Sequence, residues 1–146
     1  MIRLYTIGFT GKSAKQFFSL LEGNGVRTIL DTRISNASQL AGFAKGRDLE
    51  FFSKRIGNMG YVHNLDFAPT RELLDRYRRK EMSWNEYSKE YLSLLETRQI
   101  GKRVRIADLE NNCLLCSEHS PEKCHRRLLA EYLHSFHPEV EIIHLK

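Results

Sequence analysis

The chain has 146 residues, a length typical of one domain, and 41% of them are hydrophobic, which suffices for one core. No run of about 18 apolar residues occurs, which argues against a membrane-spanning helix. The formal net charge of +5 fits either an ordinary solvated surface or a protein that attracts phosphate groups.

The cysteines are few and clustered. Cys113, Cys116 and Cys124 are an odd set, which makes a poor disulfide framework. The N-terminal residues also lack the apolar core and cleavage site of a secretory signal. We therefore expect reduced thiols in a cytoplasmic protein.

Strand-like and helix-like segments alternate along the chain. This pattern predicts an α/β fold in three layers, with a mainly parallel sheet flanked by helices, as a single domain over residues 1–146. Residues 2–7 predict the first strand. A helix opens with a capping box at Ser13 and stops at Asn24, and residues 26–30 predict a second, parallel strand.

The middle of the chain begins with a polar loop. Residues 34–47 predict this long loop, and long loops inside compact domains are often functional. A short helix capped by Asp48 follows, and residues 60–63 predict a third strand. The residues of that helix expected to face inward are Leu49, Phe52 and Ile56.

Two helices are expected next. The first is a charged helix that opens at Pro69 or Thr70, and the second starts at a capping box formed by Ser83 and Glu86. The apolar face of the second helix comprises Trp84, Tyr87, Tyr91 and Leu94 or Leu95. The segment 99–109 is ambiguous.

The C-terminal part predicts another strand–helix–strand unit. Residues 112–117 form a buried strand, and a helix starts at Ser120-Pro121 with proline in its first position. Its apolar stripe is Leu128, Leu129, Tyr132, Leu133 and Phe136. The last strand covers residues 140–145.

Polar residues follow the predicted strands, where open parallel sheets bind their ligands. We therefore expect one shared rim of candidate site residues. The strand ends supply Gly8, Thr10, Asp31, Arg33, His63, Cys116 and Glu118, and the next helix supplies Cys124, His125 and Arg126.

Two of the thiols suit covalent or redox chemistry. A thiol close to a helix N-terminus and to cations is stabilised as the thiolate, and a neighbouring histidine such as His125 can act as its base. Cys116 and Cys124 have this context in the sequence. The competing interpretation is that both are small core residues, because cysteine is often buried.

Zinc is a weaker alternative. Cys113, Cys116, Cys124 and His125 are suitable ligand types. However, the first two lie three residues apart in a predicted strand, so their side chains point to opposite faces. We expect no metal and no cofactor.

The remaining candidates have structural alternatives. Asp31 and Arg33 share a face in extended backbone, as a structural ion pair or as a pair that orients substrate. His63 fits a hydrogen-bonded structural residue as well as a ligand contact. Gly8 permits a tight turn or a close backbone approach, but no phosphate-binding glycine motif follows it.

Two basic tracts lie outside this predicted rim. Residues 76–80 and 102–105 are rich in arginine and lysine, and the first includes Tyr77. Basic residues interleaved with aromatic ones can bind nucleic acid. Solvated helix faces are the plainer explanation.

At this point the motifs together resemble a known family. The segments Tyr-Thr-Ile-Gly-Phe-Thr at 5–10, Asp-Thr-Arg at 31–33, Leu-Ala-Gly-Phe at 40–43 and Leu-Leu-Cys-Ser-Glu to Cys-His-Arg-Arg-Leu across 114–128 are similar to motifs of the domain-of-unknown-function 488 family. The resemblance covers nearly the whole chain. The family usually has His-Ser where this chain has Phe9 and Thr10, so no catalytic side chain is expected at position 9.

The resemblance implies which residues belong to the family pattern. Its Asp-x-Arg motif matches Asp31 and Arg33, whereas Cys113 falls outside the pattern. Its cysteine motifs match Cys116, Glu118, Cys124, His125 and Arg126. The family has no established activity to carry over, but its cysteines suggest an enzyme, so the resemblance favours functional roles for Cys116 and Cys124.

These observations lead to one main hypothesis and one alternative. The main hypothesis is an enzyme that acts on a small anionic substrate, such as a nucleotide or nucleobase derivative, with Arg33 and Arg126 holding the anion. Cys116 or Cys124 is then the nucleophile or redox thiol, and the residues that handle protons are His125, Glu118 or Asp31. The alternative is a nucleic-acid-binding accessory domain without chemistry of its own.

Overall fold

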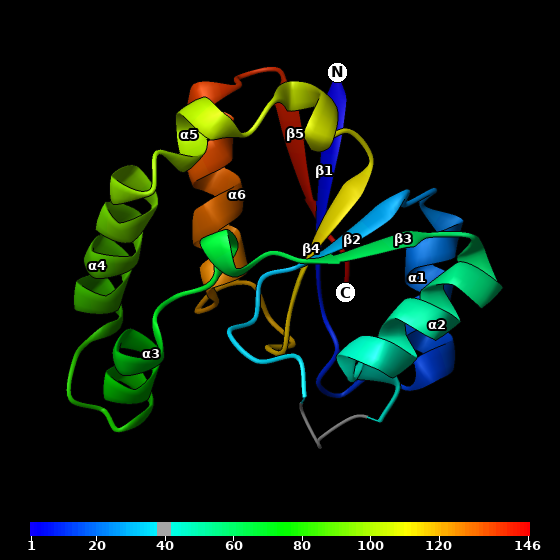
Figure 1. Cartoon of the computed structure of the whole chain (residues 1–146), viewed down its shortest axis with the longest axis horizontal. Helices are drawn as coiled ribbons and strands as arrows, with labels where there is room; N and C mark the ends of the chain where they lie inside the picture. Colours follow the sequence, from blue (N-terminus) through cyan, green and yellow to red (C-terminus); the bar gives the residue numbers. More distant parts are fainter. Residues whose placement is uncertain (38–41) are drawn as a thin grey trace.

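The computed structural model describes residues 1–37 and 42–146 and has the expected α/β architecture (Figure 1). All strand pairs in its five-stranded sheet are parallel, and the strand order is β3-β2-β4-β1-β5. The strands are β1 (Ile2–Gly8), β2 (Thr28–Asp31), β3 (Gly60–His63), β4 (Asn112–Cys116) and β5 (Val140–His144). The predicted parallel sheet is therefore confirmed.

Helices cover both faces of this sheet (Figure 1). One side carries α1 (Ala14–Gly23) and α2 (Gly46–Gly57); the other carries α3 (Arg71–Arg78), α4 (Trp84–Thr97), α5 (Ile100–Arg103) and α6 (His125–Phe136). Short 3₁₀ turns occupy Gly42–Ala44, Leu65–Phe67 and Ile106–Asp108. Within the described ranges, no helix is both long and apolar enough to cross a membrane.

Alternation along the strands divides the core into two halves. In β4, Leu114 packs in the core beneath α3–α6, whereas Cys113 and Leu115 pack in the core beneath α1 and α2. In β1, Leu4 and Tyr5 are divided in the same way. Successive strand side chains point to opposite faces, so the period of two in the sequence sets both core layers.

The predicted helix starts are confirmed where a side chain caps them. Capping boxes form at Ser13 with Gln16 and at Ser83 with Glu86, with both reciprocal hydrogen bonds present. Thr70 caps α3 by accepting from the backbone N–H of Leu73. Each cap satisfies backbone donors that have no partner within the helix.

Strand order creates a crevice beside β4. The chain leaves β2 toward α2 on one side of the sheet and leaves the neighbouring β4 toward α6 on the other. Because the two connections diverge, the carboxyl ends of β2 and β4 are not covered by a common crossing segment. Parallel sheets bind ligands at such a point.

The start of the last helix differs from its prediction. The helix α6 begins at His125, with Cys124 as its N-cap, and not at Ser120-Pro121. Proline is favoured in a first turn, but it does not by itself start a helix. Here Arg126 binds the carbonyl oxygens of Glu118 and His119, which holds the segment 117–123 as a loop.

Other local predictions also need correction. Loop 34–47 contains a 3₁₀ turn, and α2 starts at Gly46 rather than after Asp48. Phe52 and Ile56 are 37% and 46% exposed instead of facing inward. Positions 38–41, which include the first half of the Leu-Ala-Gly-Phe motif, lie outside the described residues.

Candidate functional site

A cavity of about 200 Å³ lies in the crevice between the carboxyl ends of β2 and β4 and the helices α3 and α4. Its lining combines thiols, cations and aromatic rings. The lining residues are Arg33, Ile34, Ser35, Arg71, Leu74, Tyr77, Arg78, Trp84, Tyr87, Cys116, Ser117, Glu118, Lys123, Cys124 and His125. Five of the ten candidates named from the sequence are in this lining: Arg33, Cys116, Glu118, Cys124 and His125.

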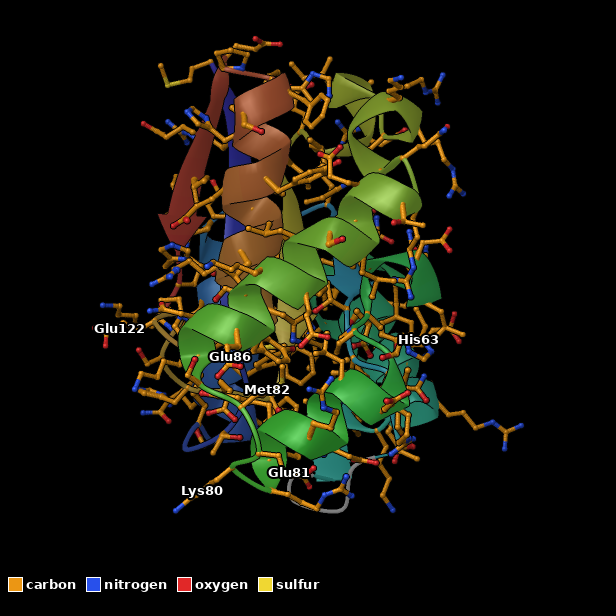
Figure 2. All side chains as sticks on the ribbon, turned by 90° about the vertical axis from the view of Figure 1, so that its left-hand side faces the viewer. His63, Lys80, Glu81, Met82, Glu86 and Glu122 are labelled. Atoms are coloured by element: carbon orange, nitrogen blue, oxygen red, sulfur yellow. A yellow bond between two sulfur atoms is a disulfide. The ribbon has the colours of Figure 1, made fainter. Side chains whose placement is uncertain are left out.

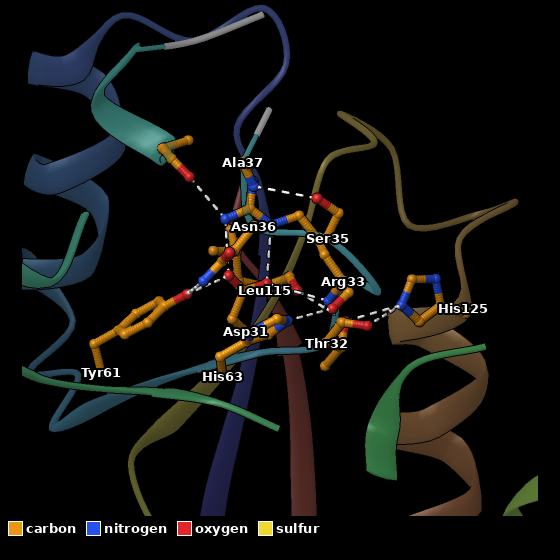
Figure 3. A network of polar contacts seen from close by, with 11 residues as sticks. Asp31, Thr32, Arg33, Ser35, Asn36, Ala37, Tyr61, His63, Leu115 and His125 are labelled. Carbon is orange, nitrogen blue, oxygen red and sulfur yellow. Dashed lines mark hydrogen bonds and ion pairs between the residues drawn. The ribbon is translucent and has the colours of Figure 1, made fainter. Parts of the chain in front are cut away.

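Asp31 and Arg33 form a buried ion pair at the end of β2 (Figure 3). The Arg33 Nε and Nη2 atoms donate to the two carboxylate oxygens of Asp31 at 2.9 and 2.8 Å. The hydroxyl of Tyr61 also donates to this carboxylate, at 2.6 Å. Asp31 does not line the cavity, so its contacts orient Arg33, which does.

One end of the Arg33 guanidinium is left without a partner. Its Nη2 atom also donates to the carbonyl oxygen of Ala44 at 2.7 Å, and the ring of Phe9 lies 5.1 Å from Cζ. The Nη1 atom is buried and has no hydrogen-bond partner among the described residues. Buried donors are nearly always satisfied, so this atom is suited to an oxygen of a ligand.

Cys116 and Cys124 are joined by a disulfide in the wall of the cavity. The expectation of reduced thiols is therefore wrong for these two residues. Residue spacing cannot show that the last residue of β4 and the N-cap of α6 meet in the fold. Cys113 is a free thiol on the opposite face of the sheet, and burial raises its pKa well above the usual value.

Arg126 is completely buried next to this disulfide and holds the loop that follows β4. Its Nη1 atom lies 3.2 Å from the Cys116 sulfur and 2.5 Å from the carbonyl oxygen of Glu118. Its other donors bind the hydroxyl of Thr6 and the carbonyl oxygen of His119, both at 3.2 Å. Burial lowers the pKa of Arg126 to about 10, so the guanidinium remains charged at neutral pH.

Gly8 and Thr10 hold the same loop from the other side. A Cβ atom on Gly8 would lie 1.5 Å from the carbonyl oxygen of Glu118, so only glycine allows this approach. The backbone N–H of Thr10 donates to the carbonyl oxygen of Ser117 at 3.0 Å. Both residues therefore shape the loop and do not line the cavity.

His125 is a neutral imidazole at physiological pH. Its Nε2 atom donates to the carbonyl oxygen of Thr32 at 2.9 Å, which leaves Nδ1 as the acceptor (Figure 3). Burial is the main cause that lowers its pKa to about 4. A neutral histidine that lines the same cavity as Cys116 and Cys124 is of the type that accepts a proton from a thiol.

The depressed pKa of His125 predicts a pH-dependent stability. Its folded-state pKa of about 4 lies below the ordinary 6.5, so its contribution is fully present above pH 6.5 and is lost as pH falls toward 4. Between pH 7 and 5 the loss is about 1 to 2 kcal/mol. Urea unfolding of the wild type and of His125→Gln at both pH values measures it; an equal pH dependence in both proteins would contradict the assignment.

Aromatic rings of α3 and α4 form the opposite wall. Trp84 and Tyr87 stack with centroids 5.4 Å apart, and Tyr77 lies 4.8 Å from Tyr87. The stack continues through Tyr91, whose ring meets the His125 ring edge-on at 5.5 Å. The sequence indicated an apolar face here, but it gave no sign that part of this face borders a cavity.

Three further cations line the cavity and were not among the predicted site residues. Arg71, Arg78 and Lys123 form no ion pair with any carboxylate in the described part of the chain. Glu118 is the one lining carboxylate among those residues. Arg33 is already neutralised by Asp31, so the lining is cationic overall. Clustered arginines in the segment 71–79 were the available signal in the sequence.

His63 and the basic tract 102–105 lie outside the cavity lining, whereas Tyr77 and Arg78 of the tract 76–80 belong to it. His63 sits at the end of β3, and its Nε2 atom is 2.6 Å from the carbonyl oxygen of Arg33, a position that supports the turn after β2. The tracts 76–80 and 102–105 are at opposite ends of α4 (Figure 1), and Lys80 projects from the turn between α3 and α4 (Figure 2). Four tract arginines pair with carboxylates: Arg76 with Glu90, Arg79 with Glu81, Arg103 with Asp66 and Arg105 with Asp108.

The four zinc-type residues do not come together. Cys113 faces α1 and α2, whereas Cys116 faces α6 and is bonded to Cys124. No cluster of three or more histidine, cysteine or acidic residues in the described ranges could hold a metal ion. The opposite orientation of Cys113 and Cys116 agrees with their spacing in the strand.

Comparison with known proteins identifies a family. The model of the family described as Domain of unknown function DUF488 matches residues 13–133. No curated protein and no solved structure matches the chain significantly.

Proposed function

The chain belongs to the family of the Domain of unknown function DUF488, and from this premise we propose that it is an enzyme acting on a small anionic substrate in the cavity beside β4. The observation that carries the proposal is that Arg33, whose Nη1 atom has no hydrogen-bond partner among the described residues, lines the same cavity as Cys116 and Cys124. An anion bound by Arg33 would thus lie in the same cavity as a reactive cysteine.

Charge supports the anionic character of the substrate. Three hydrogen bonds to Asp31 and Ala44 already hold the Arg33 side chain in place. Binding of an anion to Nη1 therefore costs little additional side-chain entropy. Arg71, Arg78 and Lys123, which form no ion pair with a carboxylate of the described residues, add positive charge to the same lining. A phosphate or carboxylate group satisfies such a cluster best.

The aromatic wall supports a flat, nucleotide- or nucleobase-like substrate. Tyr77, Trp84 and Tyr87 are in the lining, and aromatic faces stack favourably on nucleobases. In this arrangement the phosphate lies against the arginines and the base against the rings.

The chemistry is assigned to the reduced cysteines. Cys124 is the N-cap of α6, and Cys116 lies 3.2 Å from the Arg126 guanidinium, so either thiolate is electrostatically favoured. Neutral His125 takes up the thiol proton, and Glu118 is a second group in the site that can take up or release a proton. Asp31 and Arg126 act as positioning residues, because their partners are protein atoms.

Ligand binding tests the proposal. With the chain kept reduced, a nucleoside 5′-monophosphate should bind more tightly than inorganic phosphate or the free nucleoside, and should slow iodoacetamide labelling of Cys116 and Cys124. Arg78→Gln should weaken this binding about ten-fold, because one charge-assisted contact is lost. Titration calorimetry and mass spectrometry of the labelled peptides give the two readouts.

Controls make this test specific. Arg105→Gln removes an arginine that is outside the cavity lining and pairs with Asp108, and it should leave affinity unchanged. Labelling of both cysteines at the same rate with and without nucleotide, together with absent binding, would refute the proposal.

Two expectations from the sequence stay predictions. A cytoplasmic location fits an enzyme that needs reduced thiols. The nucleic-acid-binding alternative requires a continuous basic surface, and the separation of the two basic tracts by α4 disfavours it. Steep salt-dependent binding of DNA or RNA would reinstate that alternative.

A further inference from the structure

We propose that Cys116 and Cys124 form a reversible disulfide–dithiol couple that exchanges with small anionic thiols entering through the cavity. The inference rests on the proposed function, because it uses the same basic cavity as the binding site. It adds a reaction and a second class of reactant. The starting observation is that the disulfide itself lies in the cavity wall.

Access to the sulfurs is restricted to one direction. Cys116 and Cys124 are only 1% and 3% exposed, yet both are among the cavity-lining residues. A reactant that enters through the cavity therefore meets the positive charges of Arg71, Arg78 and Lys123, which line it as well. Positive charge along such a path concentrates anions and repels cations.

The surroundings of the disulfide favour attack on one sulfur and departure of the other. The Cys116 sulfur lies 3.2 Å from Nη1 of Arg126, a buried cation without a carboxylate partner in the described part of the chain. A thiolate released at Cys116 is stabilised by this charge, so Cys116 is the better leaving group. The incoming thiolate therefore attacks the sulfur of Cys124.

The exchange balances in two steps. In the first, a thiolate attacks Cys124, a mixed disulfide forms, and the Cys116–Cys124 bond breaks with its electron pair going to Cys116. In the second, another thiolate attacks the sulfur of the first thiol, which leaves as a small-molecule disulfide, and Cys124 is released as a thiolate that takes up a proton. Two small thiols are oxidised and the protein disulfide is reduced.

The charge of the thiol provides the test. Wild-type protein in its oxidised form is treated with glutathione or mercaptoethanesulfonate, with neutral mercaptoethanol, or with cationic cysteamine, at equal thiolate concentration. The anionic thiols should reduce the disulfide about ten-fold faster than mercaptoethanol, and cysteamine more slowly. Arg78→Gln should reduce this preference, whereas Arg105→Gln should keep it.

Mass spectrometry with thiol trapping follows the same samples. Reduction should add about 2 Da and expose two trappable cysteines, while buried Cys113 stays unlabelled in the native protein as an internal control. In glutathione buffers of increasing oxidised fraction, the disulfide should form again. A pair that never forms a disulfide in these buffers, or rates independent of thiol charge, would overturn the inference. Nucleotide protection of the reduced cysteines would still stand in that case, so the two proposals fail separately.

Discussion

Gly8→Ala should destabilise the protein by more than about 3 kcal/mol and displace the loop that joins β4 to α6. The new Cβ would lie 1.5 Å from the carbonyl oxygen and 2.5 Å from the carbonyl carbon of Glu118. Both are backbone atoms, so no side-chain rotation relieves the overlap. Arg126 Nη1, 2.9 Å from the same Cβ, holds that carbonyl and limits its movement.

A second glycine provides the matched control. Gly23 ends α1, and a Cβ there meets no atom within 4 Å. Gly23→Ala should therefore be neutral or stabilise by up to about 1 kcal/mol, since alanine has the better helix propensity. Urea unfolding of the wild type and the two variants measures the difference in stability. The rate of iodoacetamide labelling of Cys116 and Cys124 in the reduced proteins reports displacement of the loop. Similar unfolding free energies for Gly8→Ala and Gly23→Ala would show that the loop moves freely away from β1.

Local sequence patterns predicted the fold correctly where a side chain must satisfy particular backbone hydrogen-bond donors. The capping boxes at Ser13 and Ser83 set two helix starts because they satisfy specific backbone donors. The third strand, Gly60–His63, has the predicted bounds. The prediction at Ser120-Pro121 was wrong because tertiary contacts decide that segment: Arg126 binds the carbonyl oxygens of Glu118 and His119 directly before it.

The site was predictable in its location but not in its details. Parallel strands end at one edge, so the convergence of Arg33, Cys116 and the start of α6 follows from the strand assignment. The opposite wall comes from Tyr77 and Trp84, on helices whose packing no local pattern specifies. The disulfide, too, was not predictable, because convergence at one edge of the sheet does not give the distance between two particular sulfurs.

Roles within the site divide by what each polar side chain contacts. Arg126 has its donors on Thr6, Cys116 and two loop carbonyls, so it fixes the loop and the electrostatics of the sulfur. Arg33 has a nitrogen, Nη1, with no partner among the described residues, and is the residue suited to an external anion. Residue type alone did not distinguish these two arginines, because the sequence places both at the same predicted rim.

Asp31→Asn should lower the free energy of unfolding by about 3 kcal/mol or more and weaken anion binding. The substitution keeps the shape of the side chain but removes the charge that balances Arg33, whose side chain is only 7% exposed. Breaking one side of a buried ion pair leaves the other charge uncompensated, which costs about 3 to 5 kcal/mol. The amide nitrogen of Asn would also replace one carboxylate oxygen, so either Arg33 Nε or the two donors on the other oxygen, Arg33 Nη2 and the Tyr61 hydroxyl, would face a donor instead of an acceptor.

An exposed ion pair supplies the control for this change. Asp108 pairs with Arg105 at 3.3 Å, but the two side chains are 50% and 80% exposed, so Asp108→Asn should cost less than about 1 kcal/mol. Unfolding in urea compares the stabilities, and titration with a nucleoside monophosphate compares the affinities. If Asp31→Asn were as mild as Asp108→Asn in both measurements, Arg33 would not depend on Asp31 for its position. The assignment of Asp31 as the residue that preorganises Nη1 for an anion would then be wrong.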